Sequence, residues 1–325
     1  MIEKINGDVL RRELLERGYA ELEHGIHQDQ FDSAIEKYSS FTVNYPDPEP
    51  ETIDAMLPST PTDLTNNNWL DDLERSKDHQ QTWHKYRTNT SHIGKPNGYT
   101  SRAFQESALL ETRGIDIRED LKEYYHWTRG HHSEIQKQHD KYDWGPIPPE
   151  VTALTQAFRP IHSKASSLII QVCRTLEDDH PEITKIITPA SLRNSPLRLS
   201  AYHHSDRPNL GGFHYDKSDI TLQLTESHQG LAIAQSDQSP LTKVDRDPTK
   251  TALFMGKPLT DPDTGRYPDS PFHPGWHGIL NLDSPNQGLS PIPEAAQQRF
   301  TRWSLIFFAG ALEFMELSKD QTHVR

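Results

Sequence analysis

The pattern of apolar and polar positions changes character near Pro189, with helical periodicity before it and strand-like runs after it. Residues 7–17 carry apolar side chains on one stripe, and Gly18 is placed to end that helix. A short strand is expected at Tyr19–Leu22. A second helix is predicted by apolar side chains three or four residues apart, at Phe31, Ala34, Ile35, Tyr38 and Phe41.

The clearest helix is predicted over residues 149–177, where apolar side chains again recur at steps of three or four. Pro160 lies within it, so we expect a kink near Gln156–Phe158. Residues 45–70 are rich in proline, aspartate, threonine and asparagine, and predict an irregular segment. Residues 71–147 are polar and only weakly periodic, which predicts helix and loop.

Short strand-like runs separated by turns fill the rest of the chain, at a spacing of roughly 8–12 residues. They are Leu197–Tyr202, Phe213–Tyr215, Ile220–Thr225, Leu231–Ala234, Ala252–Met255, His277–Leu282 and Phe300–Phe308. A helical half followed by such runs predicts an α+β fold, in which an antiparallel sandwich or barrel is buttressed by helices.

The composition is that of a globular chain, with 33% hydrophobic and 25% charged residues among 325. The net charge of −13 disfavours nucleic acid and anionic membrane surfaces as partners. No apolar run approaches the roughly 20 residues that span a bilayer. The charged N-terminal segment is unlike a signal peptide, and Cys173 is the only cysteine, so we expect a cytoplasmic protein without disulfides or a thiolate metal cluster.

The 18 histidines raise the question of a metal site, because several of them stand two residues before an acid. Four such pairs lie in turns, polar helix starts or solvated stretches: His27/Asp29, His132/Glu134, His180/Glu182 and His204/Asp206. The pair His214/Asp216 differs, since strand-like runs flank it on both sides. Two imidazoles and one carboxylate hold Fe(II) on one side and leave the other side open for reactants. We therefore expect His214 and Asp216 to be two ligands of an iron site.

Three blocks of the sequence resemble the isopenicillin N synthase-like family of Fe(II)- and 2-oxoglutarate-dependent dioxygenases. The longest runs over residues 197–234 and contains His214-x-Asp216 between a Gly-rich loop and two strand-like runs. The second is Arg17–Ile26, and the third is Arg302-Trp303-Ser304 ahead of a final aromatic strand. The blocks stand in the family's order over most of the chain. The resemblance implies a double-stranded β-helix, or jelly-roll, core buttressed by helices.

The second histidine ligand has two candidates, His273 and His277. His273 is followed by Pro274-Gly275, a turn signal, whereas residues 277–281 parallel the family's His-Arg-Val-Val-Asn, so we favour His277. The 25 residues from His277 to Arg302 exceed the family's usual spacing. A loop-like insertion at 283–298 accounts for the difference, and we expect it at the mouth of the site.

By the same resemblance, Arg302 and Ser304 bind the distal carboxylate of 2-oxoglutarate, and Tyr202 also reaches it. Ser200 stands where the family often has asparagine. The implied activity is oxidation of a small molecule with O2, by hydroxylation, desaturation or cyclisation, with release of succinate and CO2. Alternatives are an iron oxidase that does not use 2-oxoglutarate, and a non-catalytic barrel protein.

We expect one compact unit, in which a helical and loop region at 1–147 covers a core at 148–325. The substrate and the oligomeric state do not follow from the sequence.

Overall fold

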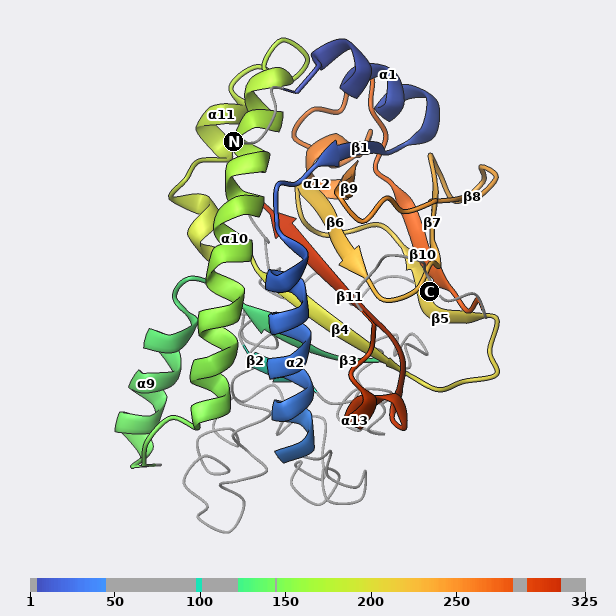
Figure 1. Ribbon diagram of the computed structural model, residues 1–325. Helices are drawn as coiled ribbons and strands as arrows, with labels where there is room; N and C mark the ends of the chain where they lie inside the picture. Colours follow the sequence, from blue (N-terminus) through green and yellow to red (C-terminus); the bar gives the residue numbers. More distant parts are fainter. Residues whose placement is uncertain (1–4, 45–97, 101–121, 144, 283–290, 311–325) are drawn as a thin grey trace, which may run out of the picture.

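The chain is described by a computed structural model over residues 5–44, 98–100, 122–143, 145–282 and 291–310 (Figure 1). Helices and antiparallel sheets are combined in it, which confirms the mixed fold expected from the sequence. The irregular segment predicted at 45–70 lies outside the described residues.

The N-terminal elements match their predictions closely. Helix α1 (Gly7–Arg17) begins at Asn6, whose side chain accepts hydrogen bonds from two backbone N–H groups, and ends at Gly18 with a positive φ of 76°. Strand β1 (Ala20–Glu23) and helix α2 (Gln28–Asn44) follow.

The region expected to be helix and loop at 71–147 also contains strands. β2 (Gly98–Thr100) and β3 (Lys122–Trp127) pair with each other, and β3 pairs with the first strand of the second half. The sequence KEYYHW mixes charged and aromatic residues on both faces, so it lacks the alternation that marks a half-buried strand. Helix α9 (His131–Tyr142) follows β3.

The long helix α10 (Pro149–Thr175) is a single element with Pro160 inside it, two residues shorter than predicted. The kink expected there stays a prediction. Short helical turns then lead into the strands: α11 (Ile183–Ile186) and the 3₁₀ turn η3 (Ser191–Asn194).

All seven strand-like runs after Pro189 overlap a strand, although Phe213–Tyr215 and His277–Leu282 extend one and two residues past the ends of theirs. The strands are β4 (Leu197–His203), β5 (Asn209–His214), β6 (Ile220–Glu226), β7 (Leu231–Ala234), β8 (Thr242–Lys243), β9 (Lys250–Met255), β10 (Trp276–Leu280) and β11 (Phe300–Ala309). Two further short helices are α12 (Lys257–Thr260) and α13 (Glu294–Gln297). α13 lies in the expected insertion and contacts α2 and β11, whereas residues 283–290 lie outside the described residues.

The strands form two antiparallel sheets. The larger has the order β1-β9-β6-β11-β4-β3-β2, and the smaller has the order β5-β10-β7-β8. From β4 to β7 the chain passes between the sheets, with β4 and β6 in the larger and β5 and β7 in the smaller.

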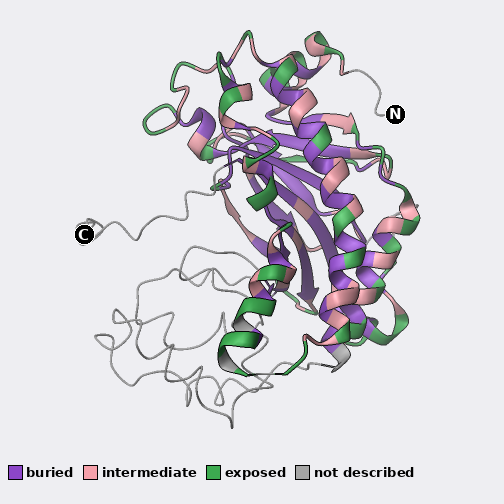
Figure 2. Ribbon diagram, turned by 90° about the vertical axis from the view of Figure 1, so that its left-hand side faces the viewer, coloured by how far each residue is buried: buried purple, intermediate pink, exposed green. Residues whose placement is uncertain are grey.

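Helices α2 and α10 lie side by side over one face of the larger sheet (Figure 1). Apolar side chains between them form the main core, and Figure 2 shows the strands beneath as almost wholly buried. Side chains alternate along β4 and β11. Leu197, Leu199 and Ala201 of β4 face the helices, together with Trp303, Leu305 and Phe307 of β11. The other face of these strands is turned toward the smaller sheet and is markedly polar.

Among the described residues, no helix is both long and apolar enough to cross a membrane.

Candidate metal centre

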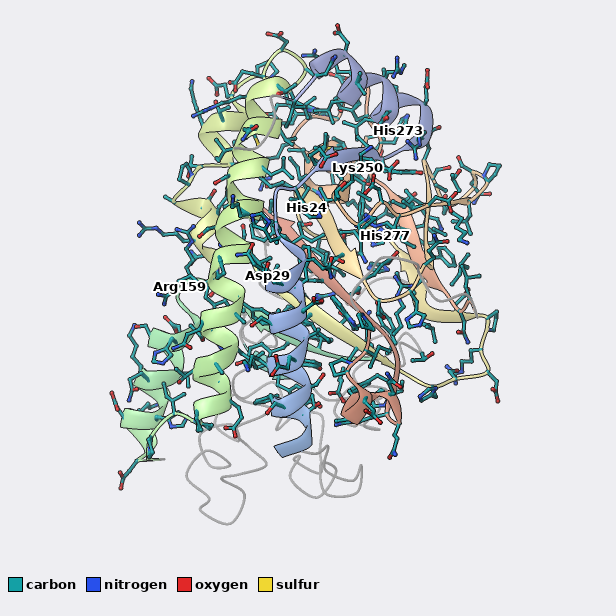
Figure 3. All side chains as sticks on the ribbon, viewed as in Figure 1. His24, Asp29, Arg159, Lys250, His273 and His277 are labelled. Carbon is teal, nitrogen blue, oxygen red and sulfur yellow. The ribbon has the colours of Figure 1, made fainter. Side chains whose placement is uncertain are left out.

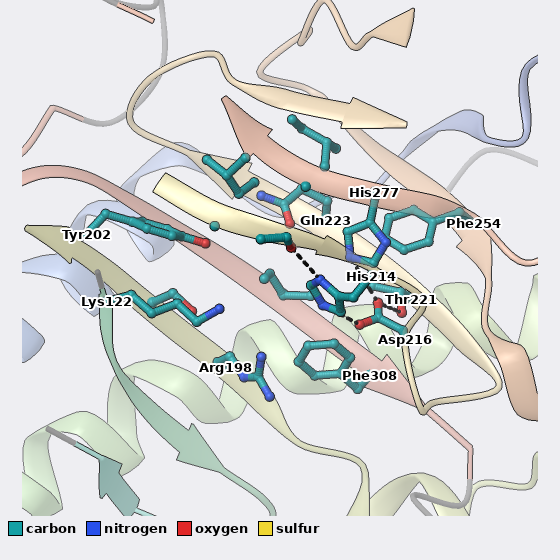
Figure 4. A pocket seen from close by; sticks show the side chains of 17 residues that line it. Lys122, Arg198, Tyr202, His214, Asp216, Thr221, Gln223, Phe254, His277 and Phe308 are labelled. Atoms are coloured by element: carbon teal, nitrogen blue, oxygen red, sulfur yellow. Dashed lines mark hydrogen bonds and ion pairs between the residues drawn. The ribbon is translucent and has the colours of Figure 1, made fainter. Parts of the chain in front are cut away.

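His214, Asp216 and His277 come together on the polar side of the larger sheet (Figure 4). His214 is the last residue of β5, and His277 lies directly opposite it on β10. The Nε2 atom of each imidazole is 3.6 Å from an oxygen of Asp216. All three ligand atoms lie within 4.8 Å of one another, and no other group of three potential metal ligands is found in the described part of the chain.

Backbone carbonyls fix the orientation of both imidazoles. The Nδ1 atom of His214 is 2.8 Å from the oxygen of Gly212, and that of His277 is 3.0 Å from the oxygen of Gly275. A carbonyl can only accept, so each Nδ1 carries the proton and each Nε2 is left with a free lone pair. This is the usual arrangement for a histidine that binds a metal.

The carboxylate of Asp216 is held by hydroxyl groups. Thr221 donates to one of its oxygens at 2.5 Å, and the hydroxyl of Thr221 is in turn 2.9 Å from that of Ser218. Residues 215–219 connect β5 to β6, and Thr221 is the second residue of β6, so the strand that follows the acid also supplies its hydrogen-bond partner.

The electrostatics of the three groups favour a cation between them. Burial lowers the pKa of His277 to about 4, against the opposing effect of Asp216, so this imidazole is neutral near pH 7. Burial would raise the pKa of Asp216, but His277, His214 and the Thr221 hydroxyl together hold it below its ordinary value. The neutral His277, the ionised carboxylate of Asp216 and the Nε2 of His214, whose ligand atoms lie within 4.8 Å of one another, fit a divalent metal ion.

A pocket opens beside the three residues, between the two sheets (Figure 4). Its apolar lining comes mainly from Leu231, Phe254, Ile279, Ile306 and Phe308. Its polar lining includes Gln223, Tyr202 and two cations, Lys122 and Arg198.

The residues predicted to bind 2-oxoglutarate lie on β4 and β11, on the same face of these strands as the pocket residues Ile306 and Phe308. Tyr202 lines the pocket, whereas Arg302 and Ser304 are fully buried beyond it. The guanidinium of Arg302 is 5.6 Å from the centre of the Tyr202 ring, and forms an ion pair with Glu226 at the end of β6.

Several buried polar atoms at Arg302 and its neighbours have no hydrogen-bond partner among the described residues. They are Nε and Nη1 of Arg302 and the hydroxyl oxygens of Ser304 and Ser200. Ser304 stands opposite both Glu226 and Ser200 across the sheet, so these groups are neighbours. Buried polar groups without partners cost free energy, and in a native protein they indicate a site for a polar ligand or water.

His273, the alternative distal ligand, is exposed and lies away from His277 (Figure 3). Two of the other histidines considered as ligands have structural partners. His180 is 2.8 Å from the hydroxyl of Ser270, and His204 is 2.8 Å from the carbonyl oxygen of Gln297.

Sequence reasoning missed several residues around the site, notably Thr221, Gln223, Lys122 and Arg198. Thr221 could have been predicted from the sequence. A hydroxyl at the start of the strand after a metal-binding acid is placed to donate a hydrogen bond to the carboxylate of that acid. Lys122 could not have been predicted, since it belongs to a strand that the pattern did not reveal.

No protein-family model matches the sequence, and no curated protein matches it either. Solved structures do match in fold. A full-length protein from Neurospora crassa, solved in complex with alpha-KG, is 14% identical, with a TM-score of 0.55 over 94% of this chain and 77% of that one. A putative 2OG-Fe(II) oxygenase family protein from Caulobacter crescentus is 17% identical, with a TM-score of 0.54 over 94% and 81%.

The 2-oxoglutarate complex of a dioxygenase for auxin oxidation from Arabidopsis thaliana is 12% identical, with a TM-score of 0.51 over 95% and 90%. These likenesses extend over nearly the whole chain. They confirm, at the level of the fold, the resemblance inferred from the sequence: this chain has the fold of the 2-oxoglutarate- and Fe(II)-dependent oxygenases.

Proposed function

We propose that the chain is an Fe(II)- and 2-oxoglutarate-dependent oxygenase that oxidises a small-molecule substrate. The observation that carries the proposal is the convergence of His214, Asp216 and His277, each oriented by its own hydrogen bond, at the edge of a pocket. Two imidazoles and one carboxylate leave half of an octahedral metal sphere open, as an oxygenase requires.

We further propose that the two sheets are the two sides of a jelly roll. The central strands β9-β6-β11-β4 of one sheet and β5-β10-β7-β8 of the other supply four strands each, and the chain alternates between them from β4 to β7 and again from β8 to β11. This connectivity is typical of the double jelly-roll sheets. β1, β2 and β3 extend the larger sheet from residues before 148, which supports a single compact unit rather than two separate domains.

In this proposal, His214, Asp216 and His277 hold Fe(II). When bound, the iron supplies the activation of O2, coupled to the oxidative decarboxylation of 2-oxoglutarate to succinate and CO2. The chain's own residues bind the metal, orient its ligands and shield the site from water. The carbonyls of Gly212 and Gly275 keep both Nε2 atoms available, and Thr221 fixes the carboxylate of Asp216. The apolar walls limit the access of water.

For 2-oxoglutarate, the proposed binding residues are Arg302, Ser304 and Tyr202. The unpartnered Nε and Nη1 of Arg302 and the Ser304 hydroxyl are donors suited to a carboxylate. Glu226 already pairs with Arg302. A second buried arginine, Arg246, interacts electrostatically with Arg302 and Glu226, and also with Glu21 and Asp247.

Oxidation of the primary substrate takes place in the space next to the three metal ligands. Hydroxylation, desaturation and cyclisation differ only in how the substrate lies there.

Succinate formation tests the proposal directly. We expect the purified protein, given Fe(II), 2-oxoglutarate and O2, to form succinate and CO2 even without a primary substrate, at a low rate. Binding of Fe(II) without succinate, together with oxygen consumption, would instead identify an iron oxidase that does not use 2-oxoglutarate. Failure to bind Fe(II) under anaerobic conditions would identify a non-catalytic barrel protein.

A further inference from the structure

Arg198 of β4 projects into the pocket from the larger sheet (Figure 4). Its guanidinium lies over two aromatic rings, 4.9 Å from the centre of Tyr124 and 4.5 Å from that of Phe308. Its Nε donates to Nε2 of His126 at 2.5 Å. These three contacts hold a planar cation in one position without neutralising its charge.

The remaining N–H groups of Arg198 are not used within the described structure. No carboxylate among the described residues forms an ion pair with it, unlike Arg302, which pairs with Glu226. His126 does not supply charge either, because burial, and the nearby Arg198 and Lys122, hold its pKa well below its ordinary value and keep it neutral. A fixed guanidinium that faces a pocket with its terminal N–H groups available is typical of bidentate carboxylate recognition.

Arg198 stands apart from the residues proposed for 2-oxoglutarate. Along β4, Tyr202 follows it by four residues, which is about 13 Å in a strand. Tyr202 stands opposite Arg302 and Ser200 opposite Ser304, whereas Arg198 stands opposite Ile306. Phe308, on which Arg198 stacks, is opposite Thr221, the partner of Asp216. Arg198 is therefore at the metal end of the pocket, whereas Tyr202 lines its other end, with Arg302 buried beyond.

We propose that the primary substrate of this oxygenase is a carboxylic acid with an apolar body, whose carboxylate is held by Arg198. This inference rests on the proposed function, since it identifies the substrate class of the same pocket. The apolar body faces Phe254, Phe308 and Ile279, which line the pocket around His277. Lys122, also in the lining, adds positive charge on the side of Tyr202.

Matched pairs of ligands test the proposal. The protein is loaded with Zn(II) and excess 2-oxoglutarate, and binding of a panel of aromatic and aliphatic monocarboxylic acids is compared with that of their primary amides by ligand-observed NMR. We expect acids to predominate among the binders, with the best acid bound about 100-fold more tightly than its amide, as removal of a charge-assisted bidentate pair implies.

Variants of Arg198 then assign the preference to this residue. Arg198→Gln should remove the difference between acid and amide, and Arg198→Lys should retain part of it, because the charge remains but the planar fork is lost. Arg159→Gln, an exposed arginine on α10, is the matched control and should change nothing (Figure 3). Affinity for 2-oxoglutarate should be the same in all four proteins.

Three results would overturn the inference. They are a panel in which acids bind no better than amides, a preference for acids that survives Arg198→Gln, and a loss of 2-oxoglutarate affinity in Arg198→Gln, which would assign the residue to the co-substrate. The proposed function fails differently, through absence of metal and 2-oxoglutarate binding in the unmodified protein before any acid is added.

Discussion

His214 and His277 lie directly opposite each other in the register of β5 and β10, with ring centres 4.5 Å apart. Two of the three candidate ligands are therefore positioned by the backbone pairing of one sheet, although they are 63 residues apart in the sequence. Only Asp216 depends on a turn, and Thr221 fixes its carboxylate. Such an arrangement holds the metal-binding atoms in place before the metal arrives, which raises affinity.

The two candidate distal histidines give opposite expectations. His277→Ala should lower the affinity for Fe(II) by more than roughly 100-fold, since it removes a direct ligand, a change larger than those seen when supporting groups around a metal are removed. His273→Ala should leave the affinity unchanged, because His273 is exposed and is not part of the group of three ligands. Anaerobic calorimetry with Fe(II) measures both. Equal loss in the two variants would contradict the assignment.

Thr221 is expected to act on the metal through Asp216. Thr221→Val keeps the shape of the side chain but removes the donor to the carboxylate, so we expect a 10- to 100-fold loss of Fe(II) affinity, on the order found for such supporting contacts. The control is Thr225→Val on the same strand. Its hydroxyl is buried without a hydrogen-bond partner, so this change should leave metal affinity intact and be neutral or stabilising. If both variants bind Fe(II) equally well, Thr221 has no such role.

The buried pair of Arg302 and Glu226 allows a structural role to be separated from a role in binding 2-oxoglutarate. Arg302→Gln leaves a buried carboxylate without its main partner, and we expect a loss of about 3 kcal/mol in the free energy of unfolding. The double variant Arg302→Gln/Glu226→Gln removes both charges and should recover most of that stability.

Affinity for 2-oxoglutarate should follow a different course. We expect it to fall by on the order of 100-fold in Arg302→Gln and to stay low in the double variant, because neither contains the guanidinium that binds the carboxylate. Chemical denaturation and titration with 2-oxoglutarate measure the two effects. Recovery of 2-oxoglutarate affinity along with stability would show that Arg302 is only a structural residue.

The sequence predicted those parts of the fold in which apolar side chains recur with a clear period or form a continuous run. The stripe of α10 and the apolar positions of β4, β6, β9 and β11 are of this kind, and they pack against the main core. β3 was not predicted, because the residues on both of its faces are polar or aromatic and show no apolar alternation. Tyr125 and Trp127 pack toward the helices, whereas Tyr124 and His126 contact Arg198 or each other on the opposite face.

The candidate site was predictable to the extent that its residues are close in the sequence. His214 and Asp216 could be selected from five similar pairs because strands flank them. The pairing of Arg302 with Glu226 could not be anticipated, since it depends on the register of β11 against β6, and this register shifts between Leu305 and Ile306. Arg198 was visible as part of a motif, but its place in the pocket follows only from the contacts of β3 and β11.

His162 makes the stability of the fold depend on pH. It is fully buried on α10, its Nε2 is 2.9 Å from the carbonyl oxygen of Ser195, and its Nδ1 accepts from Nε of Arg129 at 3.4 Å. The ring is therefore neutral, and burial lowers its pKa to about 4, even though the Ser195 carbonyl opposes this.

Well above pH 6.5, the ordinary pKa of histidine, the ring is neutral in both the folded and the unfolded chain, so it contributes no pH dependence. Between pH 6.5 and 4 the unfolded chain takes up a proton that the folded chain does not. The free energy of unfolding should therefore fall across this range, by about 3 kcal/mol for His162 alone. His24 and His131, buried with pKa values lowered to about 4 and about 3, should add to the fall.

Urea denaturation at pH values between about 7 and 4 measures this dependence in the unmodified protein and in His162→Gln. Glutamine does not titrate, so the variant should be less stable at neutral pH but should lose less stability on acidification. The informative quantity is the difference between the two proteins in how steeply the free energy of unfolding changes with pH. In this difference, the contributions of the titrating groups that both proteins share cancel. Parallel curves would mean that His162 takes up its proton equally in the folded and unfolded chains, and that burial does not shift its pKa.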